Sequence, residues 1–484
     1  MTQTTYSNAR LVGRAATQSI DQPAVSRLPF AVRLYLVMTV LPILLNVGSL
    51  TLSGQRVILL LLALPLAFNL VRGKYGRILW TDVFFFLHIA WATVAIAVNN
   101  PDRVIQNVGS AGIEFLGGYL VGRAYIRSAD ELVALARFLV FLVCCLLPLA
   151  LFETVTGRPI LMEMVGKIPG IESVEIVTIE ARMGLERVQA VFAHPIHFGI
   201  FCCAVFSLAF VGLNGLISPA RRYLFAAIIG LSVFLSLSSG ALLPLLLQLF
   251  FVFWAYSLNR VRSRWLVLLG IFILIYITIA LFSNRPPIKV FMSYATFSAH
   301  NAYWRGIIFE WGMINVWGSP IFGIGLKDWV RPFFMPSASI DNFWLAITMR
   351  YGIPGLALLV LGYFPALWSV ARRNFDADHR IWLLRRAWVF TFAGLTLTLC
   401  TVHIWTSIYS FVFFLFGAGM WFLTIEKPVP SQKSTLDEQG PKGRMANVLK
   451  LKRSVSSDIR RPAVVEVRTS QTTTSYSRFS AKRE

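Results

Sequence analysis

Two arginines and one aspartate combine residue types that act together on phosphate-bearing groups. Arg187 precedes the segment Phe192–Gly199, Arg305 lies in a later polar stretch, and Asp341 stands just before an apolar run. Guanidinium groups match phosphate oxygens in pairs and stabilise charge on a leaving group, while a carboxylate can take a proton from an attacking hydroxyl. We therefore predict catalytic roles for all three. The alternatives are that the arginines anchor the chain to lipid phosphates and that Asp341 caps a helix.

Further polar residues near these three could contact the same substrate. They are Glu153, His194, His197, Lys327, Arg331 and Asn342. Lys327 and Arg331 would add positive charge for an anion, and Glu153 could orient an arginine at the top of a helix. His194 is the second candidate for the base, after Asp341.

The two histidines belong to one short segment, FAHPIHFG, at 192–199. Pro195 fits the first turn of a helix, and His194 fits its cap. Two imidazoles separated by three residues could bind a metal ion, yet no third ligand stands nearby, so no metal or other cofactor is expected. The alternative to metal binding is that both histidines are structural and form hydrogen bonds at a helix end.

The elements that hold these residues are predicted to be membrane-spanning helices. The chain has 484 residues, of which 56% are hydrophobic and only 14% are charged, and its mean hydropathy is +0.65. This composition excludes a soluble enzyme and a DNA-binding protein. Apolar runs of about 17–25 residues recur, each long enough to cross a bilayer as a helix. They predict an all-α polytopic integral membrane protein with about twelve spans, at 33–50, 56–71, 78–98, 108–126, 132–153, 190–213, 222–238, 240–257, 264–283, 342–371, 382–402 and 404–425.

Positive charge predicts how these spans are oriented. Lys and Arg collect in alternate connections, at 72–77, 123–127, 221–222, 260–264 and 372–386. Cytoplasmic loops carry such an excess, so both termini are predicted to be cytoplasmic and the long loops 154–189 and 284–341 to face the opposite side. The net charge of +22 is therefore attributed to membrane orientation rather than to nucleic-acid binding. The alternation requires a tight turn at Ser236–Gly240 between two helices.

Three regions follow from this topology. They are a cytoplasmic segment at 1–32, a transmembrane domain at 33–426 and a basic tail at 427–484. The tail has few large apolar residues, which predicts a disordered cytoplasmic segment. It either lies on anionic membrane lipids or is simply solvated. Within the second long loop, Tyr303–Trp317 has apolar residues at helical spacing, which predicts an amphipathic helix lying on the bilayer.

Several common signatures are missing from the sequence. It contains no GxxxxGK[ST] phosphate loop and no GxGxxG segment after a strand, which argues against an ATP-driven pump. The pair Asp376 and Asp378 lies in a short basic loop and is interpreted as solvated. The five cysteines all fall within apolar runs, so no disulfide is expected.

The order of several segments resembles the O-antigen ligase and polymerase superfamily. These segments are Arg187 with FAHPIHFG, SLSSGALL at 236–243, Arg305 with WGSPIFGIG at 317–325, SIDNFWL at 339–345 and YGIPG at 351–355. The resemblance covers about residues 180–365. It implies a GT-C-like helical bundle in the bacterial inner membrane that transfers a glycan from an undecaprenyl diphosphate carrier, on the periplasmic side and without a metal. It also implies membrane lipids, a flippase and a chain-length regulator as partners, and no nucleic acid.

The chain departs from the ligase pattern at one informative place. Ligases of this superfamily carry a histidine before the tenth span, where this chain has Asp341-Asn342. An acid followed by Asn is more similar to the polymerases of repeat-unit polysaccharides, including exopolysaccharides. We therefore predict a polymerase, with a ligase as the alternative. A polysaccharide transporter or flippase and a non-catalytic scaffold remain further alternatives, although ionisable residues gathered in external loops favour a transferase.

Overall fold

The computed structural model describes residues 27–48, 50–284, 299–335 and 337–425, together with Pro287 and Val290. The chain divides into two units, Met1–Lys427 and Pro428–Glu484, and every described residue belongs to the first. The predicted tail at 427–484 and most of the segment at 1–32 lie outside the described residues.

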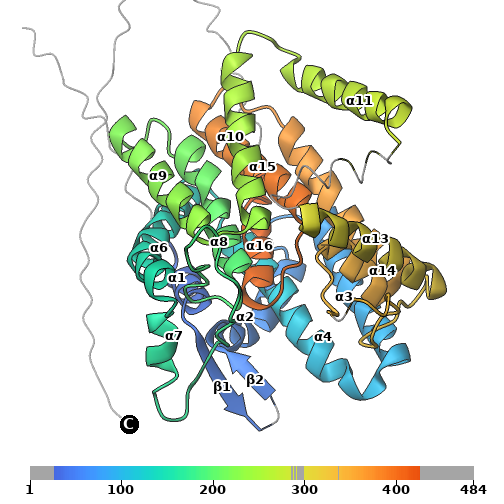
Figure 1. The fold of residues 1–484 in the computed structure, drawn as a ribbon. Coiled ribbons are helices and arrows are strands. Elements are labelled where there is room, and N and C mark those ends of the chain that lie inside the picture. Colours follow the sequence, from blue (N-terminus) through green and yellow to red (C-terminus); the bar gives the residue numbers. More distant parts are fainter. Residues whose placement is uncertain are drawn as a thin grey trace, which may run out of the picture. The chain divides into compact units, whose positions relative to one another are not determined.

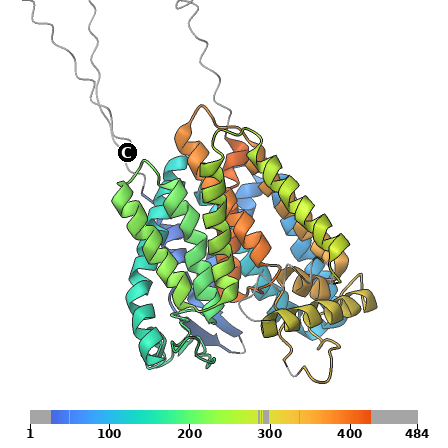
Figure 2. The same cartoon turned by 45° about the horizontal axis from the view of Figure 1, so that its top comes forward.

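Helices form most of the described chain (Figures 1 and 2). They are α1 (Phe30–Thr39), α2 (Gly54–Val71), α3 (Trp80–Asn99), α4 (Val104–Gly112), α5 (Gly118–Tyr125), α6 (Ala129–Thr156), α7 (Ile160–Val165), α8 (Pro195–Ser207), α9 (Pro219–Leu235), α10 (Ser239–Ser257), α11 (Arg264–Phe282), α13 (Ala299–Gly318), α14 (Phe343–Arg372), α15 (His379–Thr398), α16 (Thr406–Gly417) and α17 (Trp421–Thr424). A 3-10 turn at Pro101–Arg103 precedes α4, and π-helical turns at Ile113–Gly117 and Leu208–Gly212 follow α4 and α8.

Eight helices in the described ranges are long and apolar enough to cross a membrane. They are Gly54–Val71, Trp80–Asn99, Ala129–Thr156, Pro195–Gly212, Ser239–Ser257, Arg264–Phe282, Phe343–Arg372 and Thr406–Thr424. A mostly helical, multi-pass membrane protein is thereby confirmed, whereas the count of twelve stays a prediction. The predicted span 108–126 is interrupted by a π-helical turn, 222–238 coincides with the 17-residue α9, and 382–402 coincides with α15, whose first turns carry arginines. The predicted turn at Ser236–Gly240 is shorter than expected, because Ser236–Ser238 separate α9 from α10 and Ser239 already begins α10.

The first predicted span, 33–50, is wrong, because this stretch is not one continuous helix. Helix α1 ends at Thr39, and a small antiparallel sheet follows, with strand order β2-β1-β3. Its strands are β1 (Ile43–Val47), β2 (Leu50–Ser53) and β3 (Glu172–Ser173). Pro42 lacks the N–H that a continuing helix needs, and Gly48 takes a positive φ of 62° where the chain reverses.

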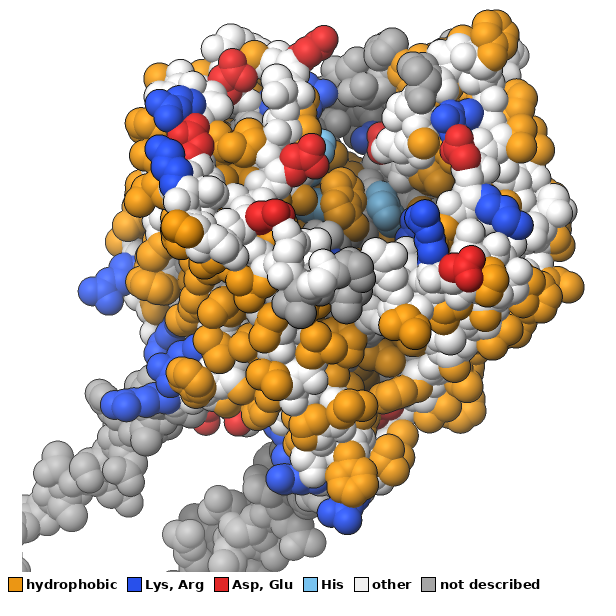
Figure 3. Space-filling view, turned by 90° about the horizontal axis from the view of Figure 1, so that it is seen from below, with side chains coloured by type: hydrophobic (Ala, Val, Ile, Leu, Met, Phe, Trp, Pro, Cys, Tyr) orange, Lys and Arg blue, Asp and Glu red, His pale blue; other side chains and the backbone are white. Residues whose placement is uncertain are grey.

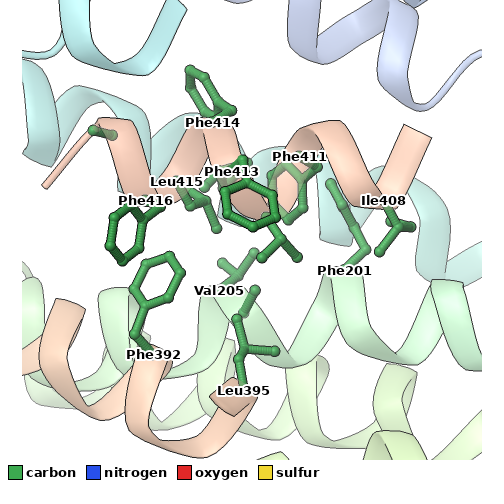
Figure 4. Packing of buried hydrophobic residues seen from close by; sticks show 14 of the residues in the cluster. Phe201, Val205, Phe392, Leu395, Ile408, Phe411, Phe413, Phe414, Leu415 and Phe416 are labelled. Carbon is green, nitrogen blue, oxygen red and sulfur yellow. The ribbon is translucent and has the colours of Figure 1, made fainter. Parts of the chain in front are cut away.

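The core is centred on α16, which is buried from Ile408 to Gly417. Figure 4 shows α16 packed against α8 and α15, with Phe411 near Phe201 of α8 and Phe416 near Phe392 of α15. A helix that is apolar on all sides belongs inside a bundle. Helix α11 is the opposite case, because none of its residues is buried by the protein.

Helices α5 and α16 approach so closely that only glycine fits between them. A methyl group at Gly122 would overlap the carbonyl oxygen of Phe414 and lie 2.7 Å from the backbone nitrogen of Ala418. Gly118, one turn earlier, faces Ser410 in the same way. Small residues spaced by four are a common way for membrane helices to bring their backbones together.

We expect Gly122→Ala to destabilise the protein by about 1–3 kcal/mol, because the added methyl must push α5 and α16 apart. The control is Gly230→Ala in α9, where nothing lies within 4 Å of the added methyl. That variant should match or slightly exceed the wild type, since alanine favours a helix by about 1 kcal/mol over glycine. Thermal unfolding of the detergent-solubilised proteins measures both. Equal melting temperatures for the two variants would contradict the close packing.

The WGSPIFGIG segment lies on a kink in α14. Gly352 has a φ of 75° inside α14, and this break leaves backbone groups free to pair with the segment. The N–H of Ile353 donates to the carbonyl of Pro320 at 2.8 Å, and the N–H of Ile324 donates to the carbonyl of Met349 at 2.7 Å. The side chain of Asn99 donates to the carbonyl of Gly323 at 3.1 Å. This glycine-rich segment therefore fastens α13 to α14 and α3.

A buried ion pair holds another loop. The Arg123 Nε and Asp82 Oδ1 atoms lie 3.5 Å apart, and both side chains are buried. Asp82 also accepts the N–H of Leu79 at 2.7 Å, while Arg123 donates to the carbonyls of Tyr75 and Arg77, both at 3.0 Å. These charges inside the bundle fix the connection between α2 and α3, so they have a structural role.

Candidate active site

Segments far apart in the sequence meet at one end of the molecule. Figure 3 shows this end, which is the lower face of Figure 1, with histidine side chains inside a hollow and basic side chains beside it. The charge of Arg187 acts on His194, and the charge of Asp341 acts on both His194 and Arg305. The chain thus brings together the segment before α8, helix α13 and the start of α14.

Arg187 and Arg305 are half-buried cations that form no ion pair among the described residues. The Nε of Arg187 and one terminal nitrogen of Arg305, Nη1, are buried and have no hydrogen-bond partner. Neither side chain forms an ion pair with any carboxylate in the described part of the chain. Burial, together with the nearby charge of Arg182, lowers the pKa of Arg187 to about 10, and burial lowers the pKa of Arg305. Arg187 therefore stays charged at neutral pH, as does Arg305, so both can accept an anionic ligand.

Asp341 and Asn342 have separate tasks. The side-chain oxygen of Asn342 accepts the N–H of Leu345 at 3.0 Å and so caps α14. The alternative that Asp341 provides this cap is therefore wrong. The Asp341 carboxylate is exposed and accepts one hydrogen bond, from the Ser339 hydroxyl at 2.9 Å, which leaves it lone pairs for another donor.

His194 caps α8, as predicted. Its Nδ1 accepts the N–H of Ile196 at 3.1 Å, so in the neutral imidazole the proton is on Nε2, which can only donate. Three residues later, His197 is completely buried, and neither of its ring nitrogens has a partner. Its ring packs edge-on against Trp405 with 3.9 Å between centroids, and His403 stacks on the same tryptophan at 5.9 Å.

The histidines do not form a metal centre. In the residues that the structure describes, no group of three or more His, Cys, Asp or Glu side chains could hold a metal ion. Trp405 packs against the rings of both His197 and His403, and the Nδ1 of His194 accepts the capping hydrogen bond.

The protein should lose stability as the pH falls below about 6.5. Burial, with a contribution from the charge of Arg187, lowers the pKa of His194 to about 4, whereas an unfolded histidine titrates near 6.5. Between these values the unfolded chain binds a proton that the folded chain does not, so stability is complete above about pH 6.5 and declines towards pH 4. Melting temperatures across this range would show the decline. The His194→Asn variant retains a capping side chain but cannot bind the proton, so its melting temperature should decline less as the pH falls. If the wild type and this variant declined equally, His194 would not be the group responsible.

Glu153, at the end of α6, binds backbone rather than an arginine. Its two carboxylate oxygens accept the N–H groups of Gln189 at 2.7 Å and Ala190 at 2.9 Å, and the side chain is 3% exposed. It forms no ion pair among the described residues, so the hypothesis that it orients an arginine is wrong. Glu153 instead fixes the chain two and three residues after Arg187.

Backbone strain is concentrated around the same residues. In the described chain, the non-glycine residues with positive φ are Met183, Ala190, Leu237 and Thr406. Met183 follows Arg182, Ala190 is held by Glu153, the carbonyl of Leu237 accepts Arg182 Nη1 at 2.9 Å, and Thr406 follows Trp405. Such conformations cost about 1–3 kcal/mol each and cluster at functional sites.

Lys327 and Arg331, both predicted to bind substrate, form their contacts away from Arg187, Arg305 and Asp341. The Arg331 guanidinium forms an ion pair with Asp328 at 2.5 Å and donates to the carbonyl of Met335 at 3.1 Å. Lys327 reaches the side chain of Asn99 at 3.4 Å. Among the described residues, neither contacts Arg187, Arg305 or Asp341, so the structure does not bring these two predicted ligands into the arginine cluster.

Three residues beside the predicted site residues were not themselves predicted from the sequence. Arg182 lies near both arginines, and His403 and Trp405 surround His197. The alternation of charged loops offered a signal, because it places the turn between 382–402 and 404–425 on the same side as the two long loops.

Residues 224–360 match a family model described as O-antigen ligase. The resemblance to the O-antigen ligase and polymerase superfamily is thereby confirmed over this region, which includes Arg305 and Asp341 but not Arg187 or His194. A comparison with curated proteins found no match. The family match, together with the apolar helices, supports a multi-pass membrane enzyme of O-antigen or related polysaccharide assembly.

Proposed function

We propose that the protein is a metal-independent glycosyltransferase that polymerises oligosaccharide repeat units carried on undecaprenyl diphosphate, on the periplasmic side of the bacterial inner membrane. The observation that carries this proposal is the pair Arg187 and Arg305, each with a buried nitrogen that lacks a partner. Two such cations beside a free carboxylate are suited to a substrate that has both a diphosphate and a hydroxyl.

The reaction needs only these side chains. The acceptor hydroxyl oxygen bonds to the anomeric carbon of the donor as the bond from that carbon to the diphosphate oxygen breaks. The electron pair leaves with undecaprenyl diphosphate, whose growing charge Arg187 and Arg305 stabilise. The hydroxyl proton passes to a carboxylate oxygen of Asp341.

His194 is better suited to hold the donor than to act as the base. Its Nδ1 lone pair is occupied by the α8 backbone, so its Nε2–H is available to donate to a phosphate or sugar oxygen. This leaves Asp341 as the preferred base, and the charge of Asp341 already acts on Arg305 and His194.

The lipid-linked glycan pool in a strain lacking the gene tests the proposal. A polymerase predicts that single repeats accumulate on the carrier and long polymer disappears. Long carrier-linked polymer that persists without reaching its acceptor would identify a ligase. An unchanged pool would contradict both and indicate transport.

A further inference from the structure

A pocket of about 480 Å³ lies at the opposite ends of the helices from the site. Helix α14 begins next to Asp341 and ends at Arg372, which lines this pocket. The pocket also includes the beginnings of α11 and α15. It is therefore separated from Asp341 by the length of α14, on the side predicted to face the cytoplasm.

Five arginines from three segments line this pocket, and none of its lining residues is acidic. They are Arg262, Arg264, Arg372, Arg385 and Arg386. Arg264 donates to the carbonyls of Leu258 and Asn259, both at 3.4 Å, and Arg385 donates to the carbonyl of Arg373 at 2.9 Å. In the described part of the chain none of the five forms an ion pair with a carboxylate, and Asp376, whose charge acts on Arg385, does not line the pocket. The positive charge is thus largely uncompensated.

Aromatic rings hold two of these arginines in place. The guanidinium of Arg372 lies 4.8 Å from the ring centre of Trp368, and that of Arg386 lies 4.9 Å from the ring centre of Trp382. Arg386 Nε is buried and has no hydrogen-bond partner. Positive charges that merely orient a membrane protein need no cavity and no ordered partners. Here the five arginines converge on one cavity, and tryptophan rings stack on two of them, Arg372 and Arg386.

The remaining wall of the pocket is apolar and continues along a lipid-facing helix. Trp265 and Leu266 of α11 line it, and no residue of α11 is buried by the protein. A ligand with its phosphate among the arginines could therefore place acyl chains along α11 without crossing water. Tryptophans near the headgroup level of a bilayer suit the same arrangement. Inorganic phosphate would use the arginines only.

We infer that this pocket binds an anionic glycerophospholipid, with the headgroup phosphate among Arg264, Arg372 and Arg386 and the acyl chains against α11. Paired guanidinium donors match the phosphate diester, and clusters of basic residues at the cytoplasmic surface attract anionic lipids. The bound lipid would neutralise arginines that otherwise repel one another. This site is independent of the proposed transfer reaction.

The test uses the full-length protein in nanodiscs of phosphatidylcholine, with or without phosphatidylglycerol. Phosphatidylglycerol should raise the melting temperature of the wild type and be retained on the protein in native mass spectrometry. The double variant R264Q/R386Q should retain no phosphatidylglycerol and show no increase in melting temperature. Its apparent affinity for phosphatidylglycerol should be weaker by roughly tenfold or more per arginine. The control R72Q/K74Q removes two exposed cations of another basic loop and should behave as the wild type.

Three results would overturn the inference. Equal responses of wild type and R264Q/R386Q to phosphatidylglycerol would show that the pocket is not used. Full protection by inorganic phosphate in phosphatidylcholine nanodiscs would show that no lipid is needed. If the double variant does not fold, the single variant R386K replaces it, since lysine keeps the charge but cannot donate paired hydrogen bonds to a phosphate. Retention of phosphatidylglycerol by R386K at the wild-type level would contradict the proposed phosphate site at Arg386.

Discussion

Replacing Arg305 with alanine should slow glycan transfer by roughly 10²–10³-fold, and replacing Arg187 should have an effect of the same size. Each change removes a preorganised charge from the leaving diphosphate. Purified protein, a lipid-linked donor and a chromatographic measure of product length would give the rates. The amount of folded protein should not fall, because neither side chain has an ion-pair partner to lose in the described structure.

Arg331 supplies the matched control for this experiment. It lies on the chain between α13 and α14, but its charge is already paired with Asp328. Arg331→Ala should therefore leave the transfer rate within a few-fold of the wild type. Arg305→Lys should recover only part of the activity, since an ammonium cannot donate two parallel bonds to a phosphate. If Arg331→Ala were as damaging as Arg305→Ala, the assignment of the phosphate site would be wrong.

Replacing Asp341 with asparagine should lower kcat by roughly 10²–10⁴-fold with little change in KM. Asparagine keeps the shape and the hydrogen bond from Ser339 but cannot accept the acceptor's proton. Single-turnover transfer from a lipid-linked donor would separate this effect from donor binding.

Variants of the neighbouring residue, Asn342, separate an effect on catalysis from an effect on folding. Asn342→Ala removes the cap of α14 and should destabilise the protein by about 1 kcal/mol without a comparable loss of kcat. Asn342→Ser keeps a capping oxygen and should restore the stability. A full loss of transfer in Asn342→Ser, with Asp341→Asn still active, would reverse the roles assigned to these two residues.

Local chemistry explains which parts of the site could be predicted. His194 was predicted as a cap because Pro195 fixes the first helical turn, and that signal is contained in adjacent residues. Asp341 and Asn342 are both good caps, so only the three-dimensional path of the chain could decide between them. The partners of Glu153 lie more than thirty residues away, at Gln189 and Ala190, and no spacing in the sequence reveals them.

The fold was predictable to the extent that hydropathy determines it. Long apolar runs gave helices at nearly every predicted position, because lipid leaves backbone groups no other partner. The β1–β2 hairpin was missed because ILLNV was read as part of the helical span 33–50 and LTLS as the connection to the next span, since periodicity cannot separate a short apolar strand from a helix. The count of spans depends on 108–126, α9 and α15. A π-helical turn interrupts the first, α9 has only 17 residues, and arginines stand in the first turns of α15.

The left-handed residues around the hollow also bear on how this protein would respond to engineering. Met183, Ala190, Leu237 and Thr406 carry side chains where glycine would be relaxed. Random libraries screened only for heat resistance should therefore yield substitutions at these four positions more often than at other positions of the chain. Libraries screened for polymer yield should leave them unchanged. A thermostable variant obtained without an activity screen would then be a poor starting point for studying transfer. Its added stability would come from relieving backbone strain in the segments that position the arginines.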